Sequence, residues 1–317
     1  MTKKLSVILM SLLAAVLVAA CGSNNSGQPA GAGSGAAQSA ELTIKHELGE
    51  TTVKKNPQKV VVFDYGTLDS LDKLGIEVAA LPKTNLPPYL SKYNDEKYVN
   101  AGSLKEPDFE KISEVQPDLI IISARQANLY EEFKKIAPTI YLGIDTKRYM
   151  ESFAENAKTI GNIFDKQAVV EEELKKLDES VKKLHEKAAA SNKNALIILA
   201  NDGKVSAYGP GSRFGLIHDE FGFRPVDTNI EDSTHGQSIS FEYIVEKNPD
   251  YLFVVDRGAA VGGQSSAKQV VENELVKNTK AYKEGNVVYL DPNYWYLSGG
   301  GLISVAEMVK EVEAGLK

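Results

Sequence analysis

One pattern in the chain occurs twice, and it limits the fold more than any other feature. Residues 108–126 read DFEKISEVQPDLIIISARQ, and residues 240–258 read SFEYIVEKNPDYLFVVDRG. Aligned without a gap, the two stretches share Phe, Glu, Ile, Pro-Asp and a late Arg at matching places. Each has helical spacing, a Pro-Asp turn and a short apolar run, which predicts a helix, a turn and a buried parallel strand. The repeat therefore predicts two similar α/β lobes.

Further apolar runs alternate with helical patterns on both sides of the repeat. KVVVFDY and PTIYLGI occur in the first half, and ALIILAND, VSAYG and NVVYL occur in the second. We therefore expect an α/β lobe over residues 41–147 and a pseudo-symmetric one over residues 191–317. Between them, residues 148–190 contain no proline and predict one long linking helix, which could break at GNIFD. Their apolar spacing does not hold a heptad long enough for a coiled coil.

The N-terminus has the features of an export signal followed by a tether. Lys3 and Lys4 precede an apolar run that ends at LVAAC, which predicts a signal over residues 1–20, too short to span a membrane comfortably. Cys21, the only cysteine, matches a lipobox and is the expected lipidation site; an ordinary secretory signal with an incidental cysteine is the alternative. Residues 21–40 are rich in Gly, Ser and Ala, which predicts a flexible tether.

Arginine is scarce, since it supplies only five of the 36 Lys and Arg residues. Arg125 and Arg257 each follow a predicted strand, and Arg213 lies in the glycine-rich GPGSRFG. Ligands of open α/β sheets bind beyond the carboxyl ends of the strands, so we expect these three in one cleft. Guanidinium groups suit delocalised oxygen anions, and three of them together favour a ligand of charge about −3. Arg148 and Arg224 are expected to be solvated.

Other features exclude some ligands and suggest others. The net charge of −7 and the pI near 5.4 argue against nucleic acid, and GPGSRFG lacks the pattern of a nucleotide phosphate loop. His235 in STHGQS and Tyr296 in YWYLSGGG lie in loops, where packing rarely requires such residues. Imidazole and phenolate both bind ferric iron, although a lone His or an aromatic cluster is also common as a structural group.

Together these features resemble the substrate-binding lipoproteins of ABC importers that have a helical hinge. Within that group, ISARQ, GSRFGLIHD, STHGQS, VDRG and YLSGGG are similar to the petrobactin and catecholate siderophore-binding lipoproteins of Gram-positive bacteria. The resemblance covers nearly the whole chain after the tether. It implies a binding protein without enzymatic activity or an intrinsic cofactor, lipid-anchored on the extracellular face of the cell membrane. Its ligand would be ferric iron in a siderophore complex, taken up for iron transport.

The resemblance also implies which residues bind the ligand. Three arginines would face a ferric tris-catecholate complex: Arg125, Arg213 and Arg257. Lys105 would assist them. His235 and Tyr296 would complete the iron shell as direct metal ligands only where the siderophore supplies too few catecholates.

A second implication concerns the importer. Glu110 and Glu242 are the matching acidic residues of the two repeats. In the family, such a pair, one carboxylate per lobe, docks into the two subunits of the permease dimer. Simple solvation of two helices is the alternative explanation for these glutamates.

Three rival functions remain to be weighed. An enzyme has little support, because no G-x-S-x-G, H-E-x-x-H or paired-carboxylate motif is present. A carrier of bare Zn²⁺ or Mn²⁺ needs converging ligands, yet the four histidines are scattered along the chain: His46, His185, His218 and His235. A haem or hydroxamate-siderophore binder on the same fold is the third rival.

Overall fold

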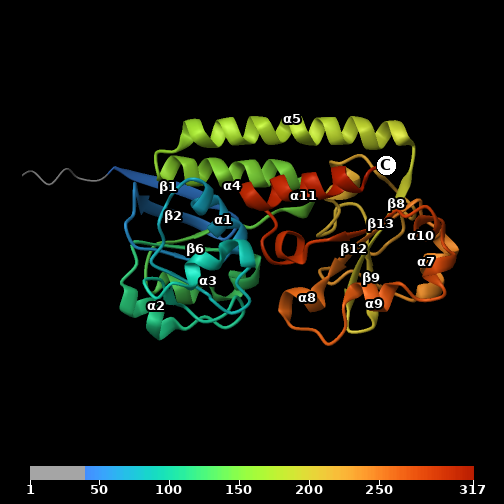
Figure 1. Ribbon diagram of the computed structural model, residues 1–317. Coiled ribbons are helices and arrows are strands. Elements are labelled where there is room, and N and C mark those ends of the chain that lie inside the picture. Colours follow the sequence, from blue (N-terminus) through green and yellow to red (C-terminus); the bar gives the residue numbers. More distant parts are fainter. Residues whose placement is uncertain (1–39) are drawn as a thin grey trace, which may run out of the picture. The chain divides into compact units, whose positions relative to one another are not determined.

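The structure is a computed structural model that describes residues 40–317. The predicted export signal, the lipidation site Cys21 and the tether up to residue 39 lie outside the described residues. The described part contains a two-stranded hairpin and two larger sheets with helices, as Figure 1 shows. This arrangement confirms the predicted class of two α/β lobes.

The first lobe is built on a five-stranded parallel sheet in the order β5-β4-β3-β6-β7. Its strands are β3 (Val60–Val62), β4 (Ala80–Leu81), β5 (Val99–Asn100), β6 (Leu119–Ile122) and β7 (Thr139–Tyr141). Its helices are α1 (Tyr65–Lys73), α2 (Phe109–Val115) and α3 (Tyr130–Lys134). An antiparallel hairpin of β1 (Glu41–His46) and β2 (Gly49–Lys54) precedes them. Every residue of β3 and β6 is buried, as expected for parallel strands covered on both faces.

The second lobe is built on a mixed sheet in the order β11-β9-β8-β12-β13, with β10 beside β8. Its strands are β8 (Asn194–Asn201), β9 (Lys204–Tyr208), β10 (Arg224–Pro225), β11 (Gln237–Ile239), β12 (Tyr251–Asp256) and β13 (Val287–Leu290). Its helices are α6 (Leu216–Asp219), α7 (Phe241–Lys247), α8 (Arg257–Val261), α9 (Ala267–Val271) and α10 (Lys280–Lys283). Unlike the all-parallel sheet of the first lobe, this sheet contains antiparallel pairs, because β9 runs antiparallel to β8 and β11 runs antiparallel to β9. Asp202 and Gly203, both with positive φ, make the tight turn that forces the reversal between β8 and β9.

The sequence repeat is also a structural repeat. Asp108 and Ser240 cap the first turns of α2 and α7, and the helices end at Gln116 and Asn248 in the left-handed conformation. The Asp of each Pro-Asp pair then fixes the neighbouring strand: Asp118 accepts from the backbone N–H groups of residues 58 and 59, and Asp250 accepts from that of residue 194. The duplicated residues therefore specify one helix–turn–strand unit twice.

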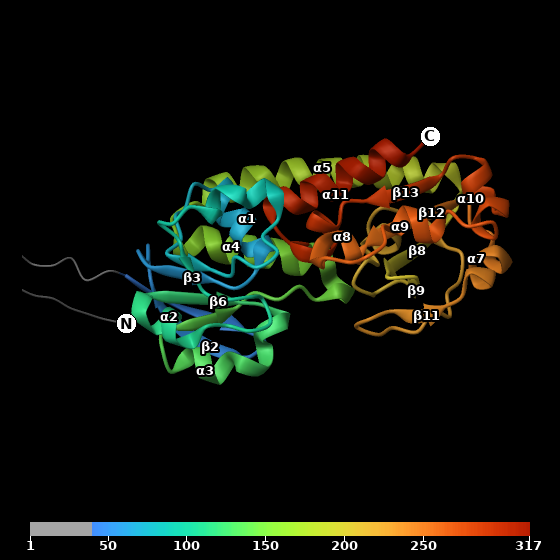
Figure 2. The ribbon, with the colours of Figure 1, turned by 60° about the horizontal axis from the view of Figure 1, so that its bottom comes forward.

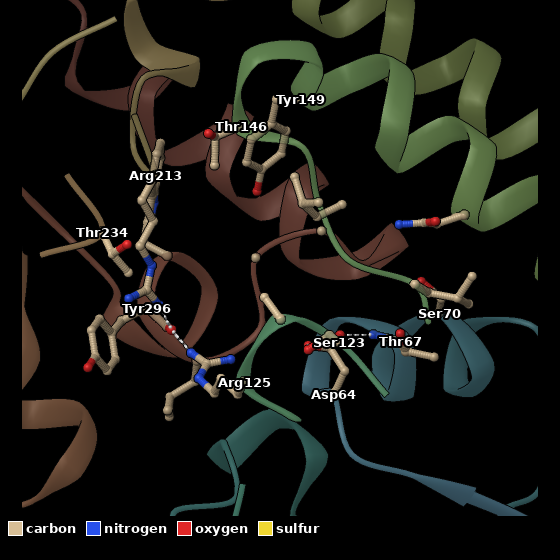
Figure 3. A pocket seen from close by; sticks show the side chains of 18 of the residues that line it. Asp64, Thr67, Ser70, Ser123, Arg125, Thr146, Tyr149, Arg213, Thr234 and Tyr296 are labelled. Carbon is tan, nitrogen blue, oxygen red and sulfur yellow. Dashed lines mark hydrogen bonds between the residues drawn. The ribbon is translucent and has the colours of Figure 1, made fainter. Parts of the chain in front are cut away.

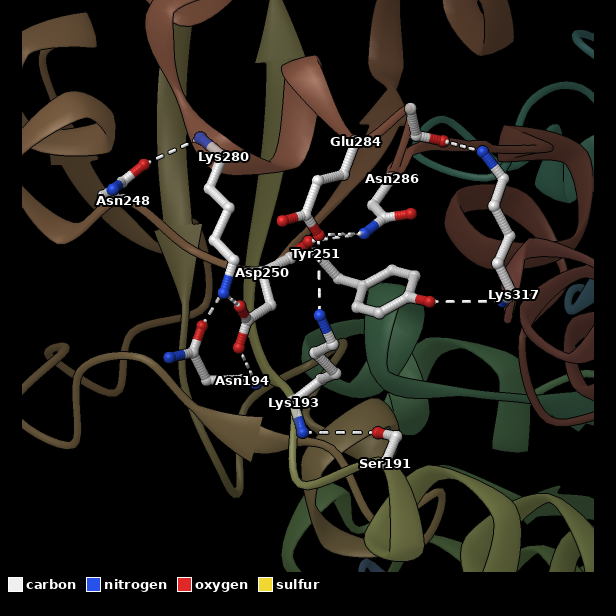
Figure 4. A network of polar contacts seen from close by, with 11 residues as sticks. Ser191, Lys193, Asn194, Asn248, Asp250, Tyr251, Lys280, Glu284, Asn286 and Lys317 are labelled. Carbon is white, nitrogen blue, oxygen red and sulfur yellow. Dashed lines mark hydrogen bonds and ion pairs between the residues drawn. The ribbon is translucent and has the colours of Figure 1, made fainter.

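The turn of the second repeat belongs to a wider polar network, shown in Figure 4. Asn194 Oδ1 accepts the backbone N–H of Asp250 at 2.8 Å, so the two residues bridge β8 and β12 reciprocally. Lys280, at the start of α10, pairs with the Asp250 carboxylate. These contacts hold the beginnings of the central strands, at the edge opposite to the ends that carry the predicted ligand residues.

The linking segment over residues 148–190 is helical, as predicted, but it is divided into two helices at the place where the sequence indicated a possible break. It contains α4 (Tyr149–Ile163) and α5 (Gln167–Ser191), and the chain breaks within GNIFD. Asp165 takes a left-handed conformation there, with φ 52°, and its carboxylate binds Lys55 and Asn56 beside the hairpin. Figure 2 shows the long helix α5 running along the last helix, α11 (Leu302–Gly315), and α5 also packs against α4.

The N-terminus of α11 is anchored on α1 by a buried carboxylate. Asp69, fully buried in α1, accepts the backbone N–H groups of Ile303 and Ser304 at 3.1 and 3.0 Å. This satisfies two of the free N–H groups of α11 and favours the positive end of its dipole. Gly301 lies so close that a Cβ at this position would overlap the Asp69 carboxylate. The glycines of SGGG therefore allow a close approach between elements far apart in the chain.

This contact predicts a specific coupling. Gly301→Ala should lower the free energy of unfolding by about 1–3 kcal/mol, because the added methyl overpacks the junction of α1 and α11. In an Asp69→Ala background, where the overlapping atoms are absent, the same change should cost clearly less. Urea denaturation of both single variants and the double variant measures this, and strictly additive losses would contradict it.

Candidate functional site

A cavity of about 400 Å³ lies beyond the carboxyl ends of strands in both lobes. Asp64 follows β3, and Ser123 and Arg125 follow β6 in the first lobe. Arg213, in the loop after β9, and Tyr296, in the π-helical turn η5 (Asn293–Leu297), come from the second half of the chain. Figure 3 shows these side chains around the cavity. This is the location expected for the ligand of an open α/β sheet.

Two guanidinium groups from different halves of the chain bind the same backbone oxygen. Arg125 donates from Nη2 to the carbonyl oxygen of Tyr296 at 2.8 Å, and Arg213 donates to that oxygen as well. Arg213 also stacks on the Tyr296 ring, with its guanidinium carbon 4.3 Å from the ring centroid. Tyr296 is therefore the point at which the predicted arginines meet.

Arg257 contacts the hydroxyl end of Tyr296 and is not part of the cavity wall. Its Nε donates to the Tyr296 hydroxyl oxygen at 3.0 Å, and its Nη1 donates to Asn201 Oδ1 at 2.8 Å. The three arginines thus come together around one residue, but only Arg125 and Arg213 line the cavity.

The cluster has no negative partner nearby. Among residues 40–317, no carboxylate lies within 4.0 Å of these three guanidinium groups, whereas the solvated Arg148 pairs with Glu151 and Glu155. Burial and the charge of Arg125 hold the pKa of the Arg213 guanidinium below its ordinary value. The three guanidinium groups therefore have no ion-pair partner, although the carboxylates of Asp64 and Asp232 lie elsewhere on the cavity wall.

The charges of the three arginines also affect the pKa of the Tyr296 phenol. Burial raises the pKa of its phenol, but the hydrogen bond from Arg257 and the charges of Arg213, Arg257 and Arg125 outweigh burial and bring that pKa below its ordinary value. A lowered pKa means that the surroundings stabilise negative charge on the oxygen. The phenol thus reports an environment suited to an anion.

Besides Arg257, two more of the predicted ligand residues lie outside the cavity wall. Lys105 and His235 are exposed, and neither belongs to the cavity wall, although Thr234 beside His235 does. Glu110 and Glu242, predicted to dock, are exposed in the first turns of α2 and α7. The repeat therefore places one exposed carboxylate at the same position of each lobe.

The structure also places residues on the cavity wall that the sequence analysis missed. Asp64 caps α1 and accepts a hydrogen bond from Ser123 Oγ at 2.8 Å. Tyr149, at the start of α4, directs its hydroxyl toward the cavity (Figure 3). Asp64 had a detectable signal, because it directly follows the apolar run of a strand that ends at this edge. Tyr149 had none, since it lies within a segment with an ordinary helical pattern.

Trp295, the single tryptophan, also belongs to the cavity wall and is 2 % exposed. Its indole Nε1 donates to Glu311 Oε2 at 2.8 Å, which ties η5 to α11. Burial raises the pKa of the Glu311 carboxyl to about 7, so fluorescence measurements on this tryptophan belong at one fixed pH. The fluorescence of Trp295 can therefore be used to follow ligand binding in the cavity.

The described chain lacks a membrane-spanning helix and a cluster of metal-binding side chains. Among residues 40–317, no helix has both the length and the apolar character needed to cross a membrane. In the same part of the chain, no cluster of three or more His, Cys, Asp or Glu side chains is arranged to hold a metal ion.

Comparison with known proteins places the chain in a family. The model of the family described as "Periplasmic binding protein" matches residues 60–294. The chain belongs to this family. Its members are binding proteins and not enzymes.

Among curated relatives, the chain is 57 % identical to the petrobactin-binding protein YclQ of Bacillus subtilis, over 99 % of each chain. It is 32 % identical to the ferric-anguibactin-binding protein FatB of Vibrio anguillarum, over 86 % of this chain and 87 % of that one. These two matches span almost the full length of each relative.

Solved structures agree with these matches. The crystal structure of YclQ superposes with a TM-score of 0.86 and 61 % identity, covering 88 % of this chain and 99 % of that one. The periplasmic catecholate-siderophore-binding protein VctP of Vibrio cholerae has a TM-score of 0.83 at 40 % identity, with 87 % and 100 % covered. The predicted resemblance to siderophore-binding proteins of this fold is thus confirmed.

Proposed function

We propose that this protein captures a ferric catecholate siderophore of the petrobactin type and delivers it to an ABC importer for iron uptake. The observation that carries the proposal is the meeting of Arg125, Arg213 and Arg257 at Tyr296, with two of these arginines on a cavity wall and no carboxylate partner among residues 40–317. The relatives named for petrobactin and for catecholate siderophores support the same ligand class.

The charge of such a ligand fits the charge of the cavity. Ferric iron is hard and prefers oxygen ligands, and three catecholates leave a complex with a charge near −3. Two unit charges about 5 Å apart repel each other by about 3 kcal/mol at an effective dielectric constant of about 20. A trianion among the arginines removes that repulsion, whereas a neutral ferric hydroxamate does not. Haem or hydroxamate binding is therefore the second candidate, favoured only by the shared fold.

The predicted ligand residues differ in how directly they would contact the complex. Arg125 and Arg213 contact the complex directly, and Arg257 supports them through the Tyr296 hydroxyl. Lys105 and His235, both exposed, would reach the complex only from the rim. Tyr296 or His235 would coordinate iron directly only where the siderophore leaves coordination sites of the iron unfilled.

The location of the protein completes the proposal. We place it on the extracellular face of the cell membrane, held by a lipid on Cys21 and the tether over residues 21–40. Residues 41–147 and 191–317 would act as the lobes, and residues 148–190 as the link between them. The mass of the mature N-terminal peptide distinguishes a lipidated Cys21 from an unmodified one.

The arginine cluster leads to a direct test. Changing Arg125, Arg213 and Arg257 together to Gln should weaken binding of a ferric tris-catecholate at least about 100-fold, because each removes a charge-assisted contact or its support. Quenching of Trp295 fluorescence measures the affinity, with ferric hydroxamate and haem as comparison ligands. Arg148→Gln, which changes a solvated arginine, is the control. Unchanged affinity in a triple variant that still folds would refute the proposal.

The paired glutamates lead to a second test, on transport. Glu110→Lys with Glu242→Lys should leave ligand affinity within about twofold and abolish uptake, because docking to the permease depends on both carboxylates. Radioactive iron uptake by cells that depend on this protein is the measurement. Glu114→Lys with Glu246→Lys reverses exposed charges on the same two helices and serves as the matched control. Normal uptake with the first pair would rule out the docking role.

A further inference from the structure

The cavity has a second polar region that differs in charge from the arginine cluster. Figure 3 shows Asp64, Thr67 and Ser70 on one side of the cavity, with Arg213, Thr234 and Tyr296 on the other and Arg125 between them. The region around Asp64 includes no arginine or lysine on the cavity wall. A ligand that fills the whole cavity therefore meets the arginines at one end and the Asp64 carboxylate at the other, while the second carboxylate of the wall, that of Asp232, pairs with Lys147 at 3.7 Å.

The Asp64 carboxylate retains capacity to bind. Oδ1 accepts the backbone N–H of Thr67 at 2.7 Å, and Oδ2 accepts the Ser123 hydroxyl at 2.8 Å. Each carboxylate oxygen can accept a second hydrogen bond. Among residues 40–317, no lysine, arginine or histidine nitrogen lies within 4.0 Å of this carboxylate. The two contacts fix the orientation of the group and leave its negative charge unpaired.

A second observation points to a ligand in the same region. Tyr149 is only 6 % exposed, and its hydroxyl has no hydrogen-bond partner among the described residues. The hydroxyl lies beside Gly299 on the cavity wall, where an added Cβ would be 3.1 Å away. The ring is buried, but the hydroxyl oxygen is open to the space of the cavity. Its hydrogen bond must therefore come from water or from a ligand in that space.

Asn156 adds an acceptor to the region. Its Nδ2 donates to the carbonyl oxygen of Gly143 at 2.9 Å, which fixes the amide and leaves Oδ1 as the free end. Asp64, at the cap of α1, and Tyr149 and Asn156, one at the start and one in the middle of α4, thus offer hydrogen-bond acceptors around one part of the cavity. A donor with a positive charge satisfies this set better than a neutral hydroxyl, because it also pairs with the carboxylate.

Building on the proposed function, we propose that the Asp64 region binds a protonated aliphatic amine carried by an arm of the ferric siderophore. Aliphatic amines have a pKa near 10.4 and are charged at neutral pH. The arginine cluster would hold the anionic iron centre, and Asp64, Tyr149 and Asn156 would receive the ammonium group. The cavity would then select siderophores that combine catecholates with amines over catecholates that lack them.

The test compares two synthetic ferric complexes of the same catecholamide, one with neutral propyl arms and one with aminopropyl arms. The ratio of their affinities is measured by Trp295 quenching in the full chain. Asp64→Asn keeps the helix cap and a partner for Ser123, yet removes the charge. This variant should lower the preference for the aminopropyl complex about tenfold. Tyr149→Phe should lower it by a smaller factor.

Glu114→Gln removes an exposed carboxylate from the same lobe and should not change the ratio. An unchanged ratio in Asp64→Asn would overturn the inference, because Asp64 would then act only as a cap and as a partner of Ser123. If the wild-type protein bound neither ferric complex, the proposed function itself would fail, and the amine site with it. Binding of both complexes without any preference in the wild type would overturn the amine site alone.

Discussion

Two positive groups from different halves of the chain share a single carbonyl oxygen. Arg125 and Arg213 both donate to the backbone oxygen of Tyr296, although like charges repel each other strongly in a partly buried cavity. Their pairing with one neutral acceptor, in place of two carboxylates, leaves both guanidinium charges without an ion-pair partner. The guanidinium groups therefore repel each other in the absence of ligand, and a large anion would offset this repulsion. This is the physical basis of the proposed ligand class.

The rest of the fold keeps that carbonyl in position. Trp295 is tied to Glu311 of α11, and the N-terminus of α11 is tied to Asp69 of α1. The turn that carries Tyr296 thus belongs to a buried junction that reaches into the first lobe. Such rigidity matters because preorganised charges bind an anion without the cost of reorientation. The glycine at position 301 lets α1 and α11 approach closely enough for this junction.

Much of this arrangement could be predicted from the sequence, because its signals are local. The repeat specifies caps, turns and strand-starting aspartates within short stretches, and Arg125 and Arg257 stand out because each ends a repeat in a chain poor in arginine. Contacts between segments far apart in the chain leave no such local pattern in the sequence. The sequence does not show that Arg257 binds the hydroxyl of Tyr296, that the Asp165 carboxylate binds Lys55 and Asn56, or that Tyr149 directs its hydroxyl at the cavity.

Ligand charge offers the most direct experimental variable. Titration of the wild-type protein with a ferric tris-catecholate of charge −3 and with a neutral ferric tris-hydroxamate of similar size isolates this variable, with Trp295 as the reporter at fixed pH. If uncompensated arginines define the site, the trianion should bind at least about 100-fold more tightly, and added salt should narrow the gap. Equal affinities for the two complexes, unaffected by salt, would contradict an electrostatic basis for recognition.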